Sequence, residues 1–583
     1  MKNLILIILF VFLGSIFTLN AQRHSKIDAL LYEKAMEQDI IEAIIIFKEQ
    51  ADVSFANKIK QKEQKGQYVF QTLQQTAQRT QAKTLAVLEK HTAAHHIFFI
   101  VNAIYAKAKL AVLEEIAQLP EVSRIQIDPI GVIDEARPSG LAQGRDLIEW
   151  GIEKIGADQV WDMGITGEGA IVGGQDTGVE WEHDAIKEQY RGWDGAAADH
   201  NYNWHDAITE ISPLHGDSTM DESLNPCGLD IDVPCDDHNH GTHTVGTMVG
   251  DDGNGNQIGV APGAKWIAAR NMERGWGKLS TYTDCFEWFL APTDVHNENP
   301  DPSKAPHVIN NSWGCPPVEG CEIDNWSIME TAINNLRAAG VVVVVSAGNN
   351  GASCGRVQNP AAIFEGSFSI GASNDMDMLG GFSSAGPVTV DGSNRLKPNV
   401  VAPGVQVRSC IRNGEYATWN GTSMSGPHVA GVVALMISAN PELAGQVELI
   451  EDILEQTAVP LFEEEDCGDF LGSTLPNTFY GYGRIDALAA VTEAMMTTNI
   501  ERVFEKVLID IFPNPVDDVL NIRMNQFGEE TSLRILDASG RLVLEENLKD
   551  ALNTIDLSKL SAGVYFYNLR NNLTNMSGRI VKK

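Results

Sequence analysis

The hydrophobic and polar positions of this chain fall into three successive patterns, and the first covers residues 22–140. Short apolar runs alternate here with polar helical stretches, a rhythm typical of a small α+β unit. The pattern predicts strands at 43–47, 97–101 and 122–127, a long Gln- and Lys-rich helix over 56–91 and a second helix around 110–118. A linker is expected over 136–144.

In residues 145–497 short, continuously apolar runs alternate with Gly-rich loops and with helical stretches such as 325–339. A strand that is apolar along its whole length is buried on both faces, which is typical of a parallel sheet covered by helices on each side. The predicted strands are 170–173, 265–268, 307–310 and 341–345. We therefore expect an α/β domain whose chemistry lies at the carboxyl ends of its strands.

The third pattern follows a predicted linker over 498–507 and occupies residues 508–583. Short strands succeed one another to the C-terminus, with turns at Gly540 and Gly563. So short a region with this rhythm favours a small β-sandwich. After an opening segment at 509–515, the predicted strands are 519–522, 532–536, 541–544, 564–569 and 577–581.

Residues 1–21 have the layout of a cleaved secretory signal. A basic start at Lys2 precedes an apolar run over 4–19, and the small residue Ala21 follows. A membrane anchor is the alternative, but the run is shorter than the roughly 20 residues that span a bilayer, and no comparable run follows. We expect an exported protein without a stable membrane span.

Net charge excludes two classes of partner. The formal charge is −35 at neutral pH, in a chain with the apolar content of a globular protein. Such a surface repels nucleic acid and anionic lipid, so neither is expected to bind.

Eight cysteines in an exported chain are expected to be paired. Two pairs each flank a short loop and are predicted disulfides: Cys227 with Cys235, and Cys315 with Cys321. The pattern assigns no partner to the other four, Cys285, Cys354, Cys410 and Cys467. No Cys-x-x-Cys pair occurs, which argues against a zinc ribbon.

Four polar residues with catalytic chemistry follow the predicted strands or open predicted helices: Asp176, His240, Asn349 and Ser423. Ser423 precedes the apolar stretch 429–439, so its hydroxyl is expected at the N-terminus of a buried helix, where negative charge is favoured. A serine hydroxyl needs a base such as His to become a nucleophile. A carboxylate can orient that imidazole, and an Asn amide can stabilise the oxyanion.

These residues lie in Asp176-Thr177-Gly178, His240-Gly241-Thr242-His243, Gly348-Asn349 and Gly421-Thr422-Ser423-Met424, and their order resembles the subtilisin-like serine proteases. The resemblance implies a subtilisin-like parallel sheet and an endopeptidase that hydrolyses polypeptides through an acyl-enzyme. It implies Asp176 as orienting carboxylate, His240 as base and Ser423 as nucleophile, with Asn349 in the oxyanion hole.

The segment after Asn311 resembles the family's substrate-binding strand, which implies that Ser312, Trp313 and Gly314 bind substrate. Residues between Cys315 and Cys321 resemble the bacillopeptidase F-like branch. Two positions depart from the family pattern. Gln175 stands where an aliphatic residue usually precedes the Asp, and Ser425 stands where Ala is usual; both are interpreted as local repacking.

The flanking regions resemble known companions of such enzymes. Residues 22–140 resemble the family's inhibitor-type propeptide, which implies a zymogen that processes itself and is blocked by its own propeptide. Residues 508–583 resemble the C-terminal sorting domain of the type IX secretion system of Bacteroidetes, on the segments 512–515, 537–541 and 560–565. That likeness implies the secretion machinery as a partner, and a secreted or cell-surface location reached through the periplasm.

The acidic and His-rich segments also allow a metal-binding interpretation. His238, His240 and His243, together with Asp236 and Asp237, have spacings that occur in zinc sites, but the other motifs favour His240 as the base, and no metal site is predicted. Asp237 and His238 are interpreted as surface residues and His243 as a structural helix residue. The loop 251–256 lacks the last Glu of an EF-hand. No cofactor is expected to be required, although calcium stays open because related proteases bind it after the catalytic His.

A catalytically dead, peptide-binding relative is the alternative function. It would keep the cleft and lack a member of the triad, and no member is missing from this sequence.

Overall fold

A computed structural model describes residues 24–132, 137–142, 147–215, 224–315, 321, 323, 325–497, 509–524, 531–537, 540–570 and 575–583. The predicted signal at 1–21 and the linker at 498–507 lie outside these residues. The chain divides into two compact units. The first contains the described residues up to Ala51 together with Gln75–Asp128, and the second contains Asp52–Gln74 and everything from Pro129 onward.

The first unit is an antiparallel sheet with helices, as the α+β prediction requires. Its strands are β1 (Ile41–Phe47), β2 (Ala94–Phe98), β3 (Ala103–Ala108) and β4 (Val122–Gln126), in the order β2-β3-β1-β4. The helices are α2 (Ala29–Glu37), α4 (Leu110–Ala117) and the part of α3 (Lys62–Lys90) from residue 75 onward. The sequence pattern did not predict β3, whose apolar residues are interrupted by Lys107.

A seven-stranded parallel sheet forms the centre of the second unit and confirms the predicted α/β fold. Its order is β15-β14-β13-β12-β7-β9-β8. The strands are β7 (Ile171–Asp176), β8 (Trp204–Asp206), β9 (Lys265–Arg270), β12 (Val308–Asn311), β13 (Val342–Ser346), β14 (Phe368–Ser373) and β15 (Val400–Pro403). The four predicted strands are β7, β9, β12 and β13, which are neighbours in the sheet.

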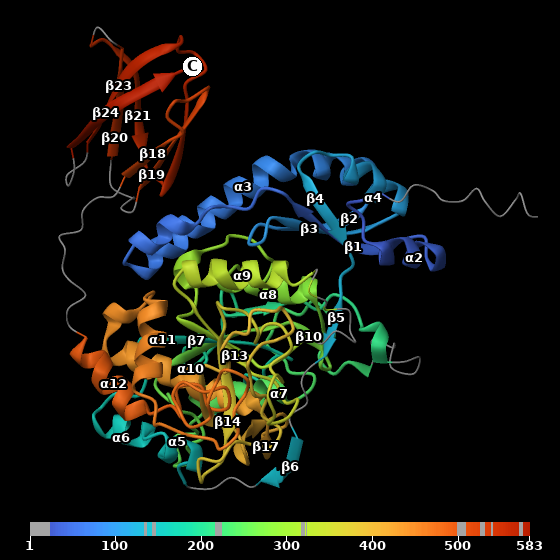
Figure 1. The fold of residues 1–583 in the computed structure, drawn as a ribbon, viewed down its shortest axis with the longest axis vertical. Helices are drawn as coiled ribbons and strands as arrows, with labels where there is room; N and C mark the ends of the chain where they lie inside the picture. The colour runs from blue at the N-terminus through green and yellow to red at the C-terminus, as the bar shows by residue number, and fades with distance from the viewer. Residues whose placement is uncertain are drawn as a thin grey trace, which may run out of the picture. The chain divides into compact units, whose positions relative to one another are not determined.

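Helices cover both faces of this sheet (Figure 1). On one side lie α7 (His240–Val249) and α10 (Thr422–Ala439), and on the other lie α8 (Leu279–Leu290) and α9 (Ser327–Ala338). Helix α10 is buried from Thr422 to Ile437, because it packs against the sheet, α7 and α12 (Ala487–Met496). A helix that is apolar all round belongs in a core, and burial of this one places its N-terminus at the sheet.

Two small antiparallel sheets flank the centre of the second unit. One has the order β10-β11-β5, with β10 (Met272–Glu273), β11 (Trp276–Lys278) and β5 (Ile130–Val132). The other has the order β16-β17-β6, with β16 (Val407–Ile411), β17 (Glu415–Asn420) and β6 (Arg137–Ala142). The segment predicted as the propeptide end and linker therefore supplies a strand to each of these sheets.

The C-terminal region forms two antiparallel sheets around its own core, as predicted for a β-sandwich. The first has the order β18-β19-β22, with β18 (Ile509–Phe512), β19 (Val519–Met524) and β22 (Leu552–Asp556). The second has the order β21-β20-β23-β24, with β20 (Thr531–Leu536), β21 (Leu542–Leu548), β23 (Gly563–Arg570) and β24 (Asn575–Lys582). Leu520, Ile535 and Leu569 are among the buried residues between them.

Both predicted disulfides are present, and a third joins Cys354 to Cys467 across 113 residues of sequence. Cys285 and Cys410 are buried free thiols, so the expectation that every cysteine is paired is wrong for these two. Burial raises the pKa of the Cys410 thiol to about 12, which keeps it protonated. Among the described residues, no helix is long and apolar enough to cross a membrane.

Candidate active site

Asp176 and His240 form a buried, hydrogen-bonded pair at the carboxyl edge of the central sheet. Asp176 is the last residue of β7 and His240 the first of α7. The Nδ1 of His240 lies 2.8 Å from Oδ1 and 2.9 Å from Oδ2 of Asp176. Both side chains are 2% exposed or less, so water does not compete for this contact. The pair leaves Nε2 of the imidazole facing away from the carboxylate.

The sequence did not reveal that Asp236 positions this pair. Its Oδ2 accepts hydrogen bonds from the backbone N–H and the hydroxyl of Thr242, at 2.9 and 2.6 Å, inside the first turn of α7. Its Oδ1 accepts from the hydroxyl of Thr177, the neighbour of Asp176, at 2.9 Å. One buried carboxylate therefore ties the start of the His240 helix to the end of β7 and complements the positive end of the helix.

Asp237 corrects the sequence interpretation, because it is not a surface residue but is 5% exposed. Its carboxylate accepts from the backbone N–H of Arg274 at 3.0 Å and lies 3.4 Å from the Arg270 guanidinium. Burial raises the pKa of Asp237 to about 8, and the charge of Arg270 opposes that shift. His238 is half-buried. The acidic loop ahead of His240 is thus part of the folded interior.

Ser423 is the second residue of α10 and is fully buried. Its Oγ donates to the carbonyl oxygen of Ser312 at 3.3 Å, and its own carbonyl accepts from the Ser312 hydroxyl at 3.1 Å. The Nε2 of His240 has no hydrogen-bond partner among the described residues. In this structure the Asp176–His240 hydrogen bond is therefore formed, and the hydrogen bond from His240 to Ser423 is not.

The two aromatic contacts of Trp419 fix the imidazoles beside the site. Trp419 stacks on His243 with ring centroids 4.5 Å apart and on His240 at 6.0 Å. His243 is fully buried, and desolvation lowers its pKa to about 3, so it stays neutral. These contacts agree with the interpretation of His243 as a structural residue.

Asn349 follows β13 and is anchored to the N-terminus of α10. Its Oδ1 accepts from the backbone N–H of Thr422 at 3.0 Å and from the Thr422 hydroxyl at 3.1 Å. The amide oxygen is therefore engaged by the residue next to Ser423, and the donor end of the same amide is Nδ2. An amide donor and the Ser423 backbone N–H at a helix N-terminus are the groups that an oxyanion hole uses.

The predicted substrate-binding segment 312–314 leaves the end of β12 and passes Ser423. The indole N–H of Trp313 donates to the carbonyl of Gln175 at 3.2 Å, and the Gln175 amide donates to the carbonyl of Tyr282 at 3.1 Å. The unusual Gln175 thus joins β7, Trp313 and helix α8. An aliphatic residue could not make that amide hydrogen bond, which gives this departure a structural role.

The aspartates of the 251–256 loop are used by the loop itself. Asp251 Oδ1 accepts from the N–H of Gly253, and Asp252 Oδ1 accepts from the N–H groups of Asn254 and Asn256. Within the described part of the chain, no group of three or more His, Cys, Asp or Glu side chains is arranged to hold a metal ion.

Comparisons with known proteins identify the families of two regions of the chain. The model of the Subtilase family matches residues 167–483, and the model of the Secretion system C-terminal sorting domain matches residues 510–583. Bacillopeptidase F of Bacillus subtilis is 36% identical over 457 residues, which are 74% of this chain and 29% of that protein. The chain thus spans less than a third of that relative's length.

Subtilisin E of Bacillus subtilis is 27% identical over 418 residues, covering 71% of this chain and 87% of that protein. Among solved structures, the epidermin leader peptide processing serine protease of Staphylococcus aureus superposes with a TM-score of 0.54 at 16% identity. That superposition covers 78% of this chain and 99% of the other, and at this identity it supports the fold alone.

Proposed function

Because this chain belongs to the subtilase family, we propose that it is an exported serine endopeptidase with Asp176, His240 and Ser423 as its triad. The observation that carries the proposal is the buried Asp176–His240 hydrogen bond at the start of α7, together with Ser423 at the N-terminus of α10, a helix that packs against α7. The geometry matches the needs of acyl transfer: an oriented base, a hydroxyl and donors for negative charge.

In the proposed reaction Ser423 Oγ attacks the carbonyl carbon of the scissile peptide, and His240 Nε2 takes the hydroxyl proton. The imidazolium then gives that proton to the leaving amine as the C–N bond breaks, which leaves an acyl-enzyme on Ser423. A water molecule, deprotonated by His240, then attacks the acyl carbon, and the imidazolium returns the proton to Ser423 Oγ as the C–O bond breaks and the acid leaves. Asp176 holds the tautomer that presents Nε2 and stabilises the imidazolium.

The oxyanion of each tetrahedral intermediate would be held by Asn349 Nδ2 and the backbone N–H of Ser423. The hydrogen bonds from Thr422 to Asn349 Oδ1 set the amide in place before substrate arrives. Preorganised donors of this kind cost no rearrangement at the moment of reaction. The proposed chemistry is carried by groups of the protein itself.

Polypeptide substrate would bind as an added strand between β11 and the segment Ser312, Trp313 and Gly314. The support is the chain's own strand β5, which pairs antiparallel with β11. An extended segment that adds to a sheet edge gains main-chain hydrogen bonds regardless of sequence. Flexible or unfolded polypeptides are therefore the expected substrate class.

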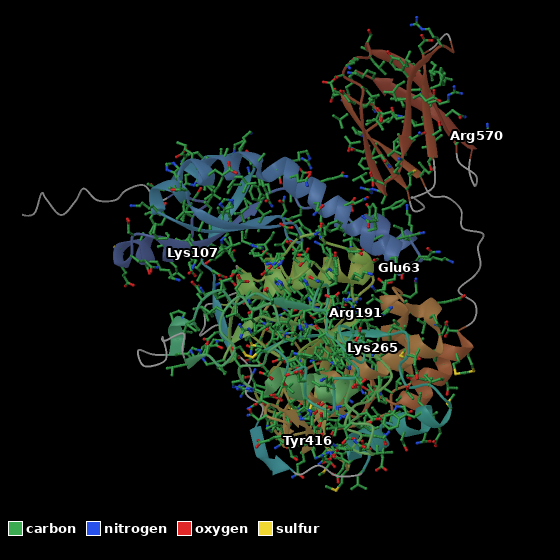
Figure 2. The ribbon with its side chains drawn as sticks, turned by 180° about the vertical axis from the view of Figure 1, so that it is seen from behind. Glu63, Lys107, Arg191, Lys265, Tyr416 and Arg570 are labelled. Atoms are coloured by element: carbon green, nitrogen blue, oxygen red, sulfur yellow. A yellow bond between two sulfur atoms is a disulfide. The ribbon has the colours of Figure 1, made fainter. Side chains whose placement is uncertain are left out.

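The chain would be made as a precursor that cuts itself. Strand β5 pairs with β11, and β6 pairs with β17, which ends at Asn420, just ahead of Ser423. Figure 2 labels Tyr416, the residue of β17 opposite Ala142 of β6. Because the chain passes from β5, paired with β11, to β6, paired with β17, we expect the new N-terminus after Val132 and before Arg137.

The sorting domain at 510–583 indicates export. We place the enzyme outside the cell or at its surface, after passage through the periplasm and recognition of the C-terminal domain by the secretion machinery. The propeptide, predicted from the sequence as residues 22–140, would on the basis of the β5 and β6 pairings end between Val132 and Arg137.

The test uses the full-length precursor with Ser423→Ala and, as a matched control, Ser425→Ala. Both serines lie on α10 and are buried, and Ser425 Oγ has no partner among the described residues. The Ser423 variant is expected to stay unprocessed and to hydrolyse no unfolded protein, whereas the Ser425 variant matures normally. Intact mass and hydrolysis rate decide the outcome. Normal maturation of purified Ser423→Ala precursor would overturn self-cleavage, and residual hydrolysis by it would overturn the assigned nucleophile.

A further inference from the structure

The strand β5 is the chain's own occupant of the substrate cleft, and its register shows which residue meets which wall. Ile130, Gly131 and Val132 lie opposite Lys278, Gly277 and Trp276 of β11. The backbone N–H of Leu279 also donates to the carbonyl of Pro129 at 3.0 Å. Strands β5 and β10, both labelled in Figure 1, are the outer strands of this small sheet, and β11 lies between them. The central residue of this strand is a glycine opposite a glycine.

Both glycines face the ring of Tyr282, in the first turns of α8. A Cβ added at Gly131 would lie 2.9 Å from the hydroxyl oxygen of Tyr282, 3.2 Å from its Cε2 and 3.2 Å from the carbonyl oxygen of Gly314. A Cβ added at Gly277 would lie 2.7 Å from Cζ of the same ring. Residues directly opposite in an antiparallel pair share one face, so the ring fills the space below both positions.

The ring of Tyr282 is held in place and cannot easily swing aside. It is fully buried and stacks on Trp313, with centroids 4.0 Å apart and planes within 7°. Trp313 donates to the Gln175 carbonyl, and the Gln175 amide donates to the backbone of Tyr282. Phe286, one helical turn further along α8, also contacts Trp313, with ring centroids 6.0 Å apart. The wall is therefore rigid, and a side chain at position 131 would have to displace packed aromatic rings.

We propose that Tyr282, stacked on Trp313, is a specificity-determining residue that restricts the substrate position opposite Gly277 to glycine. The inference rests on the proposed function, because it names the substrate class of the same cleft. Substrates would be extended polypeptides with glycine at this position, as in the chain's own Ile130-Gly131-Val132. Size exclusion by a wall is the physical cause, since the backbone pairing itself is indifferent to side chains.

The first experiment measures kcat/KM of the matured enzyme on peptides with the sequence of residues 127–142 and Gly, Ala or Leu in place of Gly131. Wild type is expected to cleave the Gly peptide about tenfold to hundredfold faster than the Leu peptide. Tyr282→Ala is expected to bring the two rates within about threefold of each other. Tyr282→Phe is the matched control and keeps the discrimination against Leu, because the ring edge remains.

The second experiment uses the precursor, where the same contact is made within the chain. Gly131→Leu is expected to slow self-cleavage by a factor similar to that seen with the peptides, and the double variant Gly131→Leu with Tyr282→Ala should recover most of the rate. Recovery by the double variant is a readout that simple damage to the fold would not give. Thermal melting of each variant checks folding.

The outcomes separate this inference from the proposed function. If wild type cleaves the Gly and Leu peptides equally, or if Tyr282→Ala folds and keeps the full preference, the role of Tyr282 is overturned while the protease stands. If wild type cleaves no peptide and its precursor never matures, the proposed function itself fails. Should Tyr282→Ala not fold, the wild-type peptide series still decides whether the position excludes side chains.

Discussion

The catalytic edge of the sheet and the strand-binding cleft are built on different principles. At the edge, Asp176 and His240 hydrogen-bond to each other, Asp236 accepts from Thr177 beside them, and Asn349 accepts from Thr422, so chemistry depends on which polar atoms are present. In the proposed cleft, the chain's own strand β5 pairs with β11 through its backbone, and the stack of Tyr282 on Trp313 limits the room beside β5. Substitutions at the edge should lower kcat without changing the preference for the Gly peptide over the Leu peptide. Substitutions in the cleft should change that preference without changing kcat.

The largest expected effect is that of Asp176→Asn. The amide keeps the shape of the side chain but stabilises the wrong imidazole tautomer, so kcat should fall by about four orders of magnitude. The ratio of kcat/KM for the Gly and Leu peptides should not change. Steady-state kinetics on both peptides checks this, and a loss of the glycine preference in the variant would break the separation between edge and cleft.

Asn349→Ala is expected to lower kcat by about 10²–10³ with little change in KM, because the lost donor acts only on the developing oxyanion. Asn350→Ala is the matched control, since Asn350 is exposed and its side-chain amide donates to the carbonyl of Arg356. The control should retain near wild-type kcat. Equal losses in the two variants would show that the turn, rather than the Asn349 amide, matters.

The elements that the sequence predicted well are those whose signal is local. Continuous apolar runs located β7, β9, β12 and β13, and short motifs at a strand end and at two helix starts located the residues of the proposed triad. Strands β8, β14 and β15 were missed because β8 is short and polar, β14 contains Ser369, Gly371 and Ser373, and β15 ends in Pro403. Their place in the sheet is set by tertiary packing, which overrides weak strand propensity.

Contacts between segments that are distant in sequence could not be predicted, because a single sequence carries no local pattern for them. The Cys354–Cys467 disulfide joins residues 113 positions apart, and the Tyr282–Trp313 stack depends on how α8 lies over the sheet. Asp237 was predicted to be a surface residue because it lies in an acidic segment. In the structure it is buried, because it contacts the guanidinium of Arg270 and the backbone N–H of Arg274. Charge runs predict exposure only where no buried partner exists.

The smallest effect, on stability alone, is expected for Asp237→Asn. Burial raises the pKa of Asp237 to about 8 in the folded protein, whereas an unfolded Asp titrates near about 3.9. Between these values the native state holds a proton that the unfolded state releases, so this group's contribution to stability falls as pH rises and levels off above about 8. The Asn variant cannot titrate.

The melting temperature of wild type relative to Asp237→Asn should therefore decline from about pH 5 to about pH 8.5, by a few degrees. Peptide preference should stay the same, because Asp237 lies outside the cleft contacts. A difference that is constant with pH would show that Asp237 is ionised throughout, held by Arg270 and Arg274.

The most direct test of the central claim is to find which residue forms a covalent adduct when the matured protein reacts with a fluorophosphonate, a reagent for activated serines. Peptide mass spectrometry is expected to place the single adduct on Ser423, and His240→Ala should abolish labelling because the hydroxyl loses its base. An adduct on another serine, or undiminished labelling of Ser423 in the His240→Ala variant, would contradict the proposed triad.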